Sequence, residues 1–312
     1  MKILVTGGAG FIGSHVAAAF QQAGHEVHVV DDLSSGRAEH VPRGVSLHVL
    51  DIRSPEIERL WGEHRFEVLC HHAAQMDVRR SVADPLFDAD VNVLGTLRLL
   101  EAGRRNGLRK VIFASTGGAI YGEPVYAPQD EEHPVRPVSP YGVSKLAAEK
   151  YLHYYYVQYG IPYVALRYAN VYGPRQNPHG EAGVVAIFTE RMLLRQQPLI
   201  YGDGLQTRDF VYVGDVVRAN LLALACPEPE VFNVGTGRET DVLTLFRLIR
   251  QAVGADVPEL HGPPRSGEQR RSVLDFAKIH RRLGWEPQVS LEEGIQRTVA
   301  YFRQALCGPH SA

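Results

Sequence analysis

A glycine-rich turn close to the N-terminus constrains the fold more than any other feature of the chain. Gly7, Gly10 and Gly13 form the pattern G-x-x-G-x-x-G after an apolar run that ends at Thr6. Glycines let the backbone turn tightly and approach a pyrophosphate at the N-terminus of the following helix. A second apolar run ends at Asp31-Asp32, where an acid that binds a dinucleotide ribose belongs. The sequence therefore predicts a dinucleotide-binding strand–helix–strand unit.

The acid after the second run also indicates which dinucleotide is bound. Asp31 is suited to accept hydrogen bonds from ribose hydroxyls and to repel a 2′-phosphate, which favours NAD over NADP. Arg37 is the nearby cation that could instead hold a 2′-phosphate. Asp51-Ile52, at the end of the third run, lies where the adenine is expected, although an ordinary strand-end turn explains this pair equally well.

Strand-like runs alternate with helical patterns through the first half of the chain. Strands are predicted over 2–6, 26–30, 46–50, 68–71, 110–114 and 163–167, and the clearest helices over 11–23, 86–105 and 141–159. This alternation predicts an α/β fold with a doubly wound, parallel, Rossmann-type sheet covered on both faces.

The alternation ends near residue 173, after which proline and glycine become frequent. We therefore predict an NAD-binding Rossmann domain over 1–173 and a smaller C-terminal lobe over 174–312. Strand-like runs at 211–213 and 231–234 suggest that segments within 205–238 return to the first domain.

Composition excludes several other classes of protein. The 312 residues are 45% hydrophobic, enough for a large core, and a net charge of −2 without a basic stripe argues against nucleic-acid binding. No apolar run is long enough to cross a bilayer, and Met1 leads directly into a strand, so we expect no membrane partner and no signal peptide. Cys70, Cys226 and Cys307 predict free thiols in a reducing cytoplasm, and no His-x-x-x-His or Cys-x-x-Cys spacing predicts a metal site.

Tyr141 and Lys145 are the residues most indicative of chemistry. Side chains four apart on a helix lie on one face, and an ammonium near a phenol favours the phenolate. Lowering the pKa of a phenol from about 10 to near 7 requires roughly 4 kcal/mol of differential stabilisation. A close cation in a water-poor site can supply this energy, so the tyrosine can act as a base near neutral pH. With a bound dinucleotide, the pair predicts hydride transfer at a carbon that bears a hydroxyl.

These features together resemble an extended short-chain dehydrogenase/reductase, and within that class the UDP-glucose 4-epimerase-like members of the NAD-dependent epimerase/dehydratase family. The resemblance extends from Met1 to about Phe302. It rests on TGGAGFIG at 6–13, DDLSSG at 31–36, HAAQ at 72–75, SPYGVSK at 139–145, RYANVYGP at 167–174, RDFVYV at 208–213 and RSGE at 265–268.

The resemblance implies that the chain binds NAD and transfers hydride through the tyrosine–lysine pair. Tyr141 would take the proton from the C4 hydroxyl of the sugar, and Lys145 would bind the nicotinamide ribose and, with the positive charge of the cofactor, lower the tyrosine pKa. The implied cofactor-binding residues are Gly7, Gly10, Phe11, Ile12, Gly13, Asp31, Asp32, Leu33, Ser34, Ser35, Gly36, Asp51, Ile52, His72, Ala73, Ala74, Gln75, Asn92, Tyr141, Lys145 and Tyr168.

A second hydroxyl and its neighbours indicate which reaction follows. Relatives share the sugar hydroxyl between the tyrosine and a serine or threonine, here Ser115 or Thr116, and we prefer Thr116. Dehydratases of the family carry an Asp-Glu pair directly after that residue, whereas this chain has Gly117-Gly118. Elimination is therefore disfavoured. The implied reaction is 4-epimerisation through a 4-keto sugar, with NAD unchanged.

The resemblance also implies a UDP-sugar substrate, although dTDP stays open as the nucleotide. Arg208 and Arg265 would hold the diphosphate, since an arginine fork matches phosphate oxygens. The other implied substrate contacts are Thr116, Asn170, Val184, Val185, Leu199, Ile200, Tyr201, Glu268 and Ser272. Ser272 stands where relatives restricted to unsubstituted hexoses carry a tyrosine, so we expect some activity on UDP-N-acetylglucosamine.

Two further expectations concern assembly and alternative functions. The helices over 86–105 and 141–159 form the dimer interface in relatives, and the crowded tyrosines of the second helix suit such an interface, so we expect a homodimer. A UDP-glucuronate 4-epimerase, another nucleotide-sugar oxidoreductase and a non-catalytic NAD-binding regulator remain the alternatives.

Overall fold

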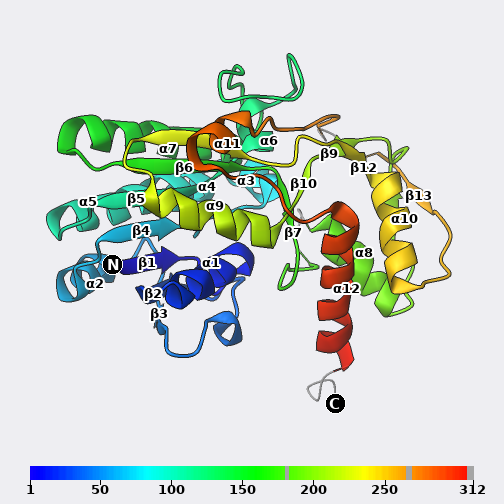
Figure 1. Cartoon of the computed structure of the whole chain (residues 1–312), viewed down its shortest axis with the longest axis horizontal. Helices are drawn as coiled ribbons and strands as arrows, with labels where there is room; N and C mark the ends of the chain where they lie inside the picture. The colour runs from blue at the N-terminus through cyan, green and yellow to red at the C-terminus, as the bar shows by residue number, and fades with distance from the viewer. Residues whose placement is uncertain (180–182, 265–268, 308–312) are drawn as a thin grey trace.

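The computed structural model describes residues 1–179, 183–264 and 269–307. Its centre is a seven-stranded parallel sheet in the order β11-β6-β5-β4-β1-β2-β3 (Figure 1). The strands are β1 (Lys2–Thr6), β2 (Glu26–Asp31), β3 (Ser46–Val49), β4 (Val68–His71), β5 (Lys110–Thr116), β6 (Tyr163–Tyr168) and β11 (Glu230–Val234). The strand order reverses between β1 and β4, which is where ligands bind in sheets of this type. The predicted doubly wound fold is confirmed.

Two apolar layers cover the two faces of the sheet. One layer contains α1 (Phe11–Gln22), α9 (Val213–Ala225) and α11 (Ala277–Leu283), and the other α2 (Glu56–His64), α5 (Thr96–Arg105) and α7 (Pro140–Tyr159). Side chains alternate along each strand, so Ile3 and Val5 enter the first layer whereas Leu4 enters the second. Burial of each such side chain stabilises the fold by about 1.5–3 kcal/mol.

A third core lies beside the sheet and belongs to the C-terminal part of the chain. It is built from α8 (Val184–Leu193), α10 (Val242–Val253) and α12 (Leu291–Cys307), which pack together in Figure 1. Three two-stranded pairs connect it to the sheet: β7 (Asn170–Tyr172) with β10 (Phe210–Tyr212), β9 (Thr207–Arg208) with β12 (Thr240–Asp241), and β8 (Ile200–Tyr201) with β13 (His261–Gly262). Between these pairs the chain returns to the main sheet, where β11 lies parallel to β6.

The prediction of a single helix over 86–105 is wrong, because the structure divides this segment into three parts. These are α4 (Pro85–Ala89), the π-helical stretch η2 (Asp90–Gly95) and α5. A π-helix widens the turn, and such turns often accompany functional sites. Short helices α3 (Val78–Ala83) and α6 (Gly117–Tyr121) and the 3₁₀ turn η1 (Ala38–His40) complete the first half. Among the described residues, the search for a helix long and apolar enough to span a bilayer finds none.

Candidate active site

The glycine turn between β1 and α1 is packed so closely that side chains are excluded. A Cβ on Gly7, which has φ +68°, would lie 2.6 Å from the backbone nitrogen of Ala73, and one on Gly13 would lie 2.2 Å from the carbonyl oxygen of Gly7. No side chain caps the N-terminus of α1, and its first turn contains no acidic residue. The bare helix terminus therefore suits a pyrophosphate, and these residues fit a dinucleotide.

Asp31 connects this turn to the loop that follows β2. Its carboxylate accepts hydrogen bonds from the backbone nitrogens of Ala9 and Leu33, each at 2.9 Å. Burial raises the pKa of Asp31, and these N–H donors oppose the rise. A Cβ on Gly36 would lie only 2.8 Å from the same carboxylate, so the loop closes directly over the acid.

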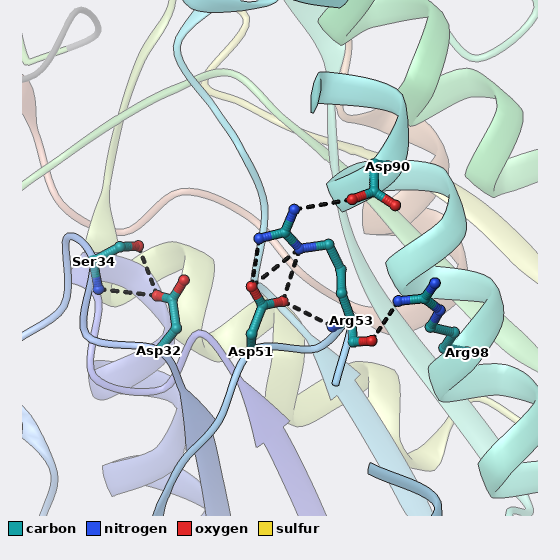
Figure 2. A network of polar contacts seen from close by, with 6 residues as sticks. All are labelled: Asp32, Ser34, Asp51, Arg53, Asp90 and Arg98. Carbon is teal, nitrogen blue, oxygen red and sulfur yellow. Dashed lines mark hydrogen bonds and ion pairs between the residues drawn. The ribbon is translucent and has the colours of Figure 1, made fainter. Parts of the chain in front are cut away.

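Asp32 and Asp51 lie at the ends of neighbouring strands (Figure 2). Asp32 is exposed and accepts hydrogen bonds from the backbone nitrogen and the hydroxyl of Ser34, at 2.9 and 2.6 Å. Asp51 binds the guanidinium of Arg53, with an ion pair of 2.6 Å, and this hydrogen bonding lowers the pKa of Asp51. Arg53 also binds Asp90 at 2.9 Å and thereby ties the strand end to η2.

A network of buried hydrogen bonds fixes the backbone of the loop that follows β4. The backbone nitrogen of Gln75 donates to Oδ1 of Asn92 at 2.9 Å, and Nδ2 of Asn92 donates to the Gln75 carbonyl at 2.8 Å. The buried carboxylate of Asp88 accepts from the side-chain amides of both residues and from the hydroxyl of Ser144 on α7. Asn92 therefore shapes the predicted cofactor loop over 72–75 by fixing its backbone.

Tyr141 and Lys145 lie in the first turns of α7, as their spacing requires. The Lys145 ammonium is buried, lies 6.0 Å from the centre of the Tyr141 ring and donates to the carbonyl of Ala114 at 2.9 Å. The Tyr141 backbone nitrogen donates to the hydroxyl of Ser81 at 3.2 Å. Between the pair, a Cβ on Gly142 would lie 2.3 Å from the carbonyl oxygen of Ala119. Glycine in the Tyr-Gly-Val-Ser-Lys motif therefore lets α7 contact α6.

The protein chain by itself does not lower the pKa of Tyr141, so the lowering expected from Lys145 together with the positive charge of NAD stays a prediction. Burial raises the pKa of this phenol, and the negative charge of Asp88 adds to the rise. Desolvation lowers the pKa of Lys145 to about 8, opposed by Asp88 and Glu149. Lys145 is thus mostly charged at pH 7, but its ammonium is directed to a backbone carbonyl rather than to the phenol.

The two candidate hydroxyls at the end of β5 have different surroundings. Ser115 is buried and donates to Oε1 of Glu149 at 2.6 Å, and Glu149 forms a buried ion pair of 2.6 Å with Arg167. Thr116 is only half-buried and caps α6, where its hydroxyl accepts from the Ala119 nitrogen at 3.5 Å. This arrangement favours Thr116, the preferred candidate, over Ser115, because the Ser115 hydroxyl is already bound to Glu149 inside the protein.

The two glycines after Thr116 meet the C-terminal half of the chain. A Cβ on Gly117 would lie 2.6 Å from both methyl carbons of the buried Leu274 side chain. A Cβ on Gly118 would lie 3.3 Å from the hydroxyl oxygen of Ser272, which is itself buried. Ser272 therefore lies against the segment that carries Thr116, and the nearest groups to these glycines carry no charge.

The other predicted substrate residues divide between ligand-accessible and core positions. Arg208, Asn170, Val184, Leu199 and Tyr201 are each partly exposed. In contrast, Val185 and Ile200 are buried in the third core, and Tyr168 is buried under the sheet, where its hydroxyl accepts from Asn220 at 2.8 Å. The side chains of these three residues are therefore part of the protein core, and their predicted ligand contacts stay predictions. Arg265 and Glu268 lie outside the described residues.

Sequence reasoning missed Asp88 and Glu149, the two buried acids that position the site. Glu149 lies four residues after Lys145, so helical spacing alone would have placed it on the same face. Asp88 has a weaker signal, because it is one of several acids in the helical pattern predicted over 86–105.

The fold and site define a dinucleotide-binding enzyme of the extended short-chain dehydrogenase/reductase class. The sequence model of the NAD dependent epimerase/dehydratase family matches residues 3–235, and the chain belongs to this family. The UDP-glucose 4-epimerase of Mycolicibacterium smegmatis is 49% identical over 310 residues, which cover 97% of this chain and 99% of that protein.

Two solved structures are similar over nearly the whole chain. The UDP-glucose 4-epimerase of Thermotoga maritima with UDP-glucose is 52% identical with a TM-score of 0.96, and the alignment covers 98% of this chain and 100% of that chain. The UDP-glucose 4-epimerase of Thermus thermophilus in complex with NAD is 48% identical with a TM-score of 0.93, and the same shares of the two chains are covered.

Proposed function

We propose that this protein is an NAD-dependent UDP-hexose 4-epimerase that interconverts UDP-glucose and UDP-galactose. The observation that carries the proposal is the segment Gly117-Gly118, which follows Thr116 and contacts Leu274 and Ser272. Elimination of water from a sugar needs an acid and a base beside the sugar ring. This segment offers neither, so oxidation at C4 followed by reduction is the reaction that the residues support.

In this proposal Tyr141 is the reversible base for the C4 hydroxyl and Thr116 is its hydrogen-bonding partner. When bound, NAD supplies the hydride acceptor for C4 and a positive charge that favours the Tyr141 phenolate. Lys145 would bind the nicotinamide ribose, and its ammonium is positioned by the hydrogen bond that it donates to the carbonyl of Ala114. The 4-keto sugar turns about its diphosphate and is reduced on its other face, so no net redox change occurs.

The proposed substrate contacts come from both halves of the chain. Arg208 and Arg265 would bind the diphosphate, Asn170 the diphosphate or the sugar, Glu268 the nucleotide ribose, and the segment from Leu199 to Tyr201 the uracil. Val184, at the start of α8, would face the substrate. The small side chain of Ser272, adjacent to Gly118, leaves room beside the sugar. This supports N-acetylated hexoses as additional substrates.

We also infer a homodimer and a cytoplasmic location. The exposed apolar residues of α7 include Tyr151, Tyr154 and Val157, with 40%, 49% and 68% of their surface accessible, and Leu86 on α4 is 82% accessible. Such a patch across adjacent helices supports an interface. Cys70, Cys226 and Cys307 are all free thiols, which supports a reducing compartment.

The decisive experiment is incubation with UDP-glucose, UDP-N-acetylglucosamine and UDP-glucuronate without added NAD or NADH, followed by chromatographic separation of the products. We expect UDP-galactose from UDP-glucose, and some UDP-N-acetylgalactosamine. Conversion of UDP-glucuronate alone would replace the proposal with a glucuronate epimerase. Failure to convert any UDP-sugar, by protein shown to contain NAD, would favour a non-catalytic regulator.

A further inference from the structure

Three histidines from separate elements converge at the far edge of the sheet, next to β3. His28 lies on β2, His48 on the edge strand β3, and His64 at the last residue of α2. One ring nitrogen of each lies within 4.8 Å of those of the other two. The His28 and His48 rings are stacked at 5.3 Å, and the His28 and His64 rings are 4.5 Å apart. We propose that His28, His48 and His64 form a binding site for a divalent transition-metal ion of the zinc type.

The contacts of His28 leave one of its ring nitrogens with a free lone pair that can bind a metal. Its Nε2 lies 3.2 Å from a carboxylate oxygen of Glu26, and since a carboxylate only accepts, Nε2 carries the proton. The lone pair of Nδ1 therefore points at Nε2 of His48, 3.0 Å away. A carboxylate that fixes the tautomer and direction of a histidine is the usual support of a histidine–metal bond. Lys2 in turn holds Glu26 at 3.0 Å.

The spacing of the rings also fits a metal. Imidazole nitrogens about 2.0–2.1 Å from one zinc ion stand roughly 3.0–3.4 Å from each other. The distance of 3.0 Å between Nδ1 of His28 and Nε2 of His48 lies in this range, and a ring nitrogen of His64 lies within 4.8 Å of those of the other two.

The surroundings define the class of ion and its access. Phe66 packs against the rings of His28 and His64 and shields one side of the cluster. His28 is buried, whereas His48 and His64 are partly exposed and leave an entry path from solvent. Three imidazoles select zinc, nickel, cobalt or copper rather than magnesium or calcium, which prefer oxygen ligands. The sequence predicts no metal site because the three residues come from different elements and share no short spacing.

The proposed ion would bind to the structural framework, away from Tyr141, and would join an edge strand to its neighbour and to α2. The test uses full-length protein without an affinity tag, stripped with a chelator and titrated with ZnCl₂ by isothermal calorimetry. We expect one zinc ion per chain and a rise of roughly 4–8 °C in melting temperature at saturation. Epimerase activity is not the readout, so failure of this site leaves the proposed function untouched.

Variants of the two partly exposed rings decide whether this cluster is the site. His48→Gln and His64→Gln should each weaken zinc binding at least tenfold, and Glu26→Gln roughly tenfold through loss of orientation. The control His280→Gln removes an exposed histidine on α11, at the opposite edge of the sheet, and should bind zinc like the wild type. Absence of zinc binding by the wild type, or binding that both cluster variants retain, would overturn the proposal. Circular dichroism melts without zinc establish that each variant is folded.

Discussion

The Ser115 hydroxyl donates to the Glu149 carboxylate at 2.6 Å, and the interaction is buried under α7. The same carboxylate binds Arg167 through two hydrogen bonds, so β5, β6 and α7 meet at one acid. Ser115 thus contributes to the framework at the end of β5, whereas Thr116 is the hydroxyl that we propose for the substrate.

This relationship predicts that substitution of Thr116 mainly affects catalysis, whereas substitution of the adjacent Ser115 mainly affects stability. Thr116→Val should lower kcat about 10–100-fold, because the sugar hydroxyl loses a hydrogen bond that strengthens as charge develops. Ser115→Ala should leave kcat within about threefold but lower the melting temperature, because Glu149 loses a buried donor. Steady-state kinetics with UDP-galactose and thermal melts measure both. A larger loss of kcat in Ser115→Ala would reverse the assignment.

Tyr141→Phe should reduce kcat by about 10²–10⁴-fold, because the base is removed while the ring is kept. The variant should retain its fold and its bound NAD, since the hydrogen bond that Tyr141 donates to Ser81 comes from its backbone nitrogen and not from the phenol. Absorbance and mass analysis of the released cofactor provide the control. Unchanged activity would show that another group is the base.

Ser272→Tyr should narrow the substrate range. A tyrosine ring at this position, next to Gly118, is expected to exclude an N-acetyl group, so activity on UDP-N-acetylglucosamine should fall at least tenfold while activity on UDP-glucose stays within a few-fold. Ser272→Ala is the matched control and should keep both activities. Equal rejection of N-acetylated sugars by wild type and variant would refute the role of this residue.

Lys145 predicts a pH dependence of stability in cofactor-free protein. Its pKa in the folded protein is about 8, lowered from 10.5, so the folded state releases its proton before the unfolded state does. Below pH 8 both states carry the charge and the folded state bears the full cost of burying it. Between pH 8 and 10.5 this cost disappears as pH rises. Relative to Lys145→Met, wild type should gain on the order of 3 kcal/mol of unfolding free energy across that window, measured by urea titration. A flat difference between the two proteins would refute the lowered pKa.

The exposed face of α7 predicts the assembly state. A Tyr154→Glu, Val157→Glu double variant should sediment as a monomer, because charges would enter the apolar centre of the proposed interface. Leu260→Glu is the control, since Leu260 is 49% accessible but lies in the C-terminal part of the chain. Analytical ultracentrifugation distinguishes the outcomes, and a wild-type monomer would refute the homodimer.

The sequence was most informative where local patterns determine local structure. The glycine turn, the strands of the sheet and the Tyr141–Lys145 spacing follow from apolar periodicity and helix geometry, and the structure has them where they were predicted. Side-chain contacts across the sheet could not be predicted in this way. Whether Ser115 faces Glu149 or a ligand depends on the packing of α7 against β5, and the convergence of three histidines depends on the strand order.

The prediction of helix boundaries at residues 86–105 was wrong for a related reason. Apolar spacing there resembles one amphipathic helix, and the interruption at η2 follows from tertiary contacts. Asn92 must reach the backbone of Gln75, while Gly95 must contact Ile52, where a Cβ would lie 2.7 Å from a methyl carbon. The sequence of this segment alone does not show that Asn92 and Gly95 make these contacts with residues outside it.

The π-helical stretch η2 makes the length of this segment as consequential as its composition. The hydrogen bonds of a π-helix span one residue more than those of an α-helix, so this stretch carries an extra residue between two α-helical segments. Asp88, before the stretch, and Asn92, within it, reach the cofactor loop, whereas Leu99 and Leu100, after it, reach the core beneath the sheet. The number of residues in the stretch therefore sets the rotation between these two sets of contacts, a constraint that a comparison of residue types alone would not detect.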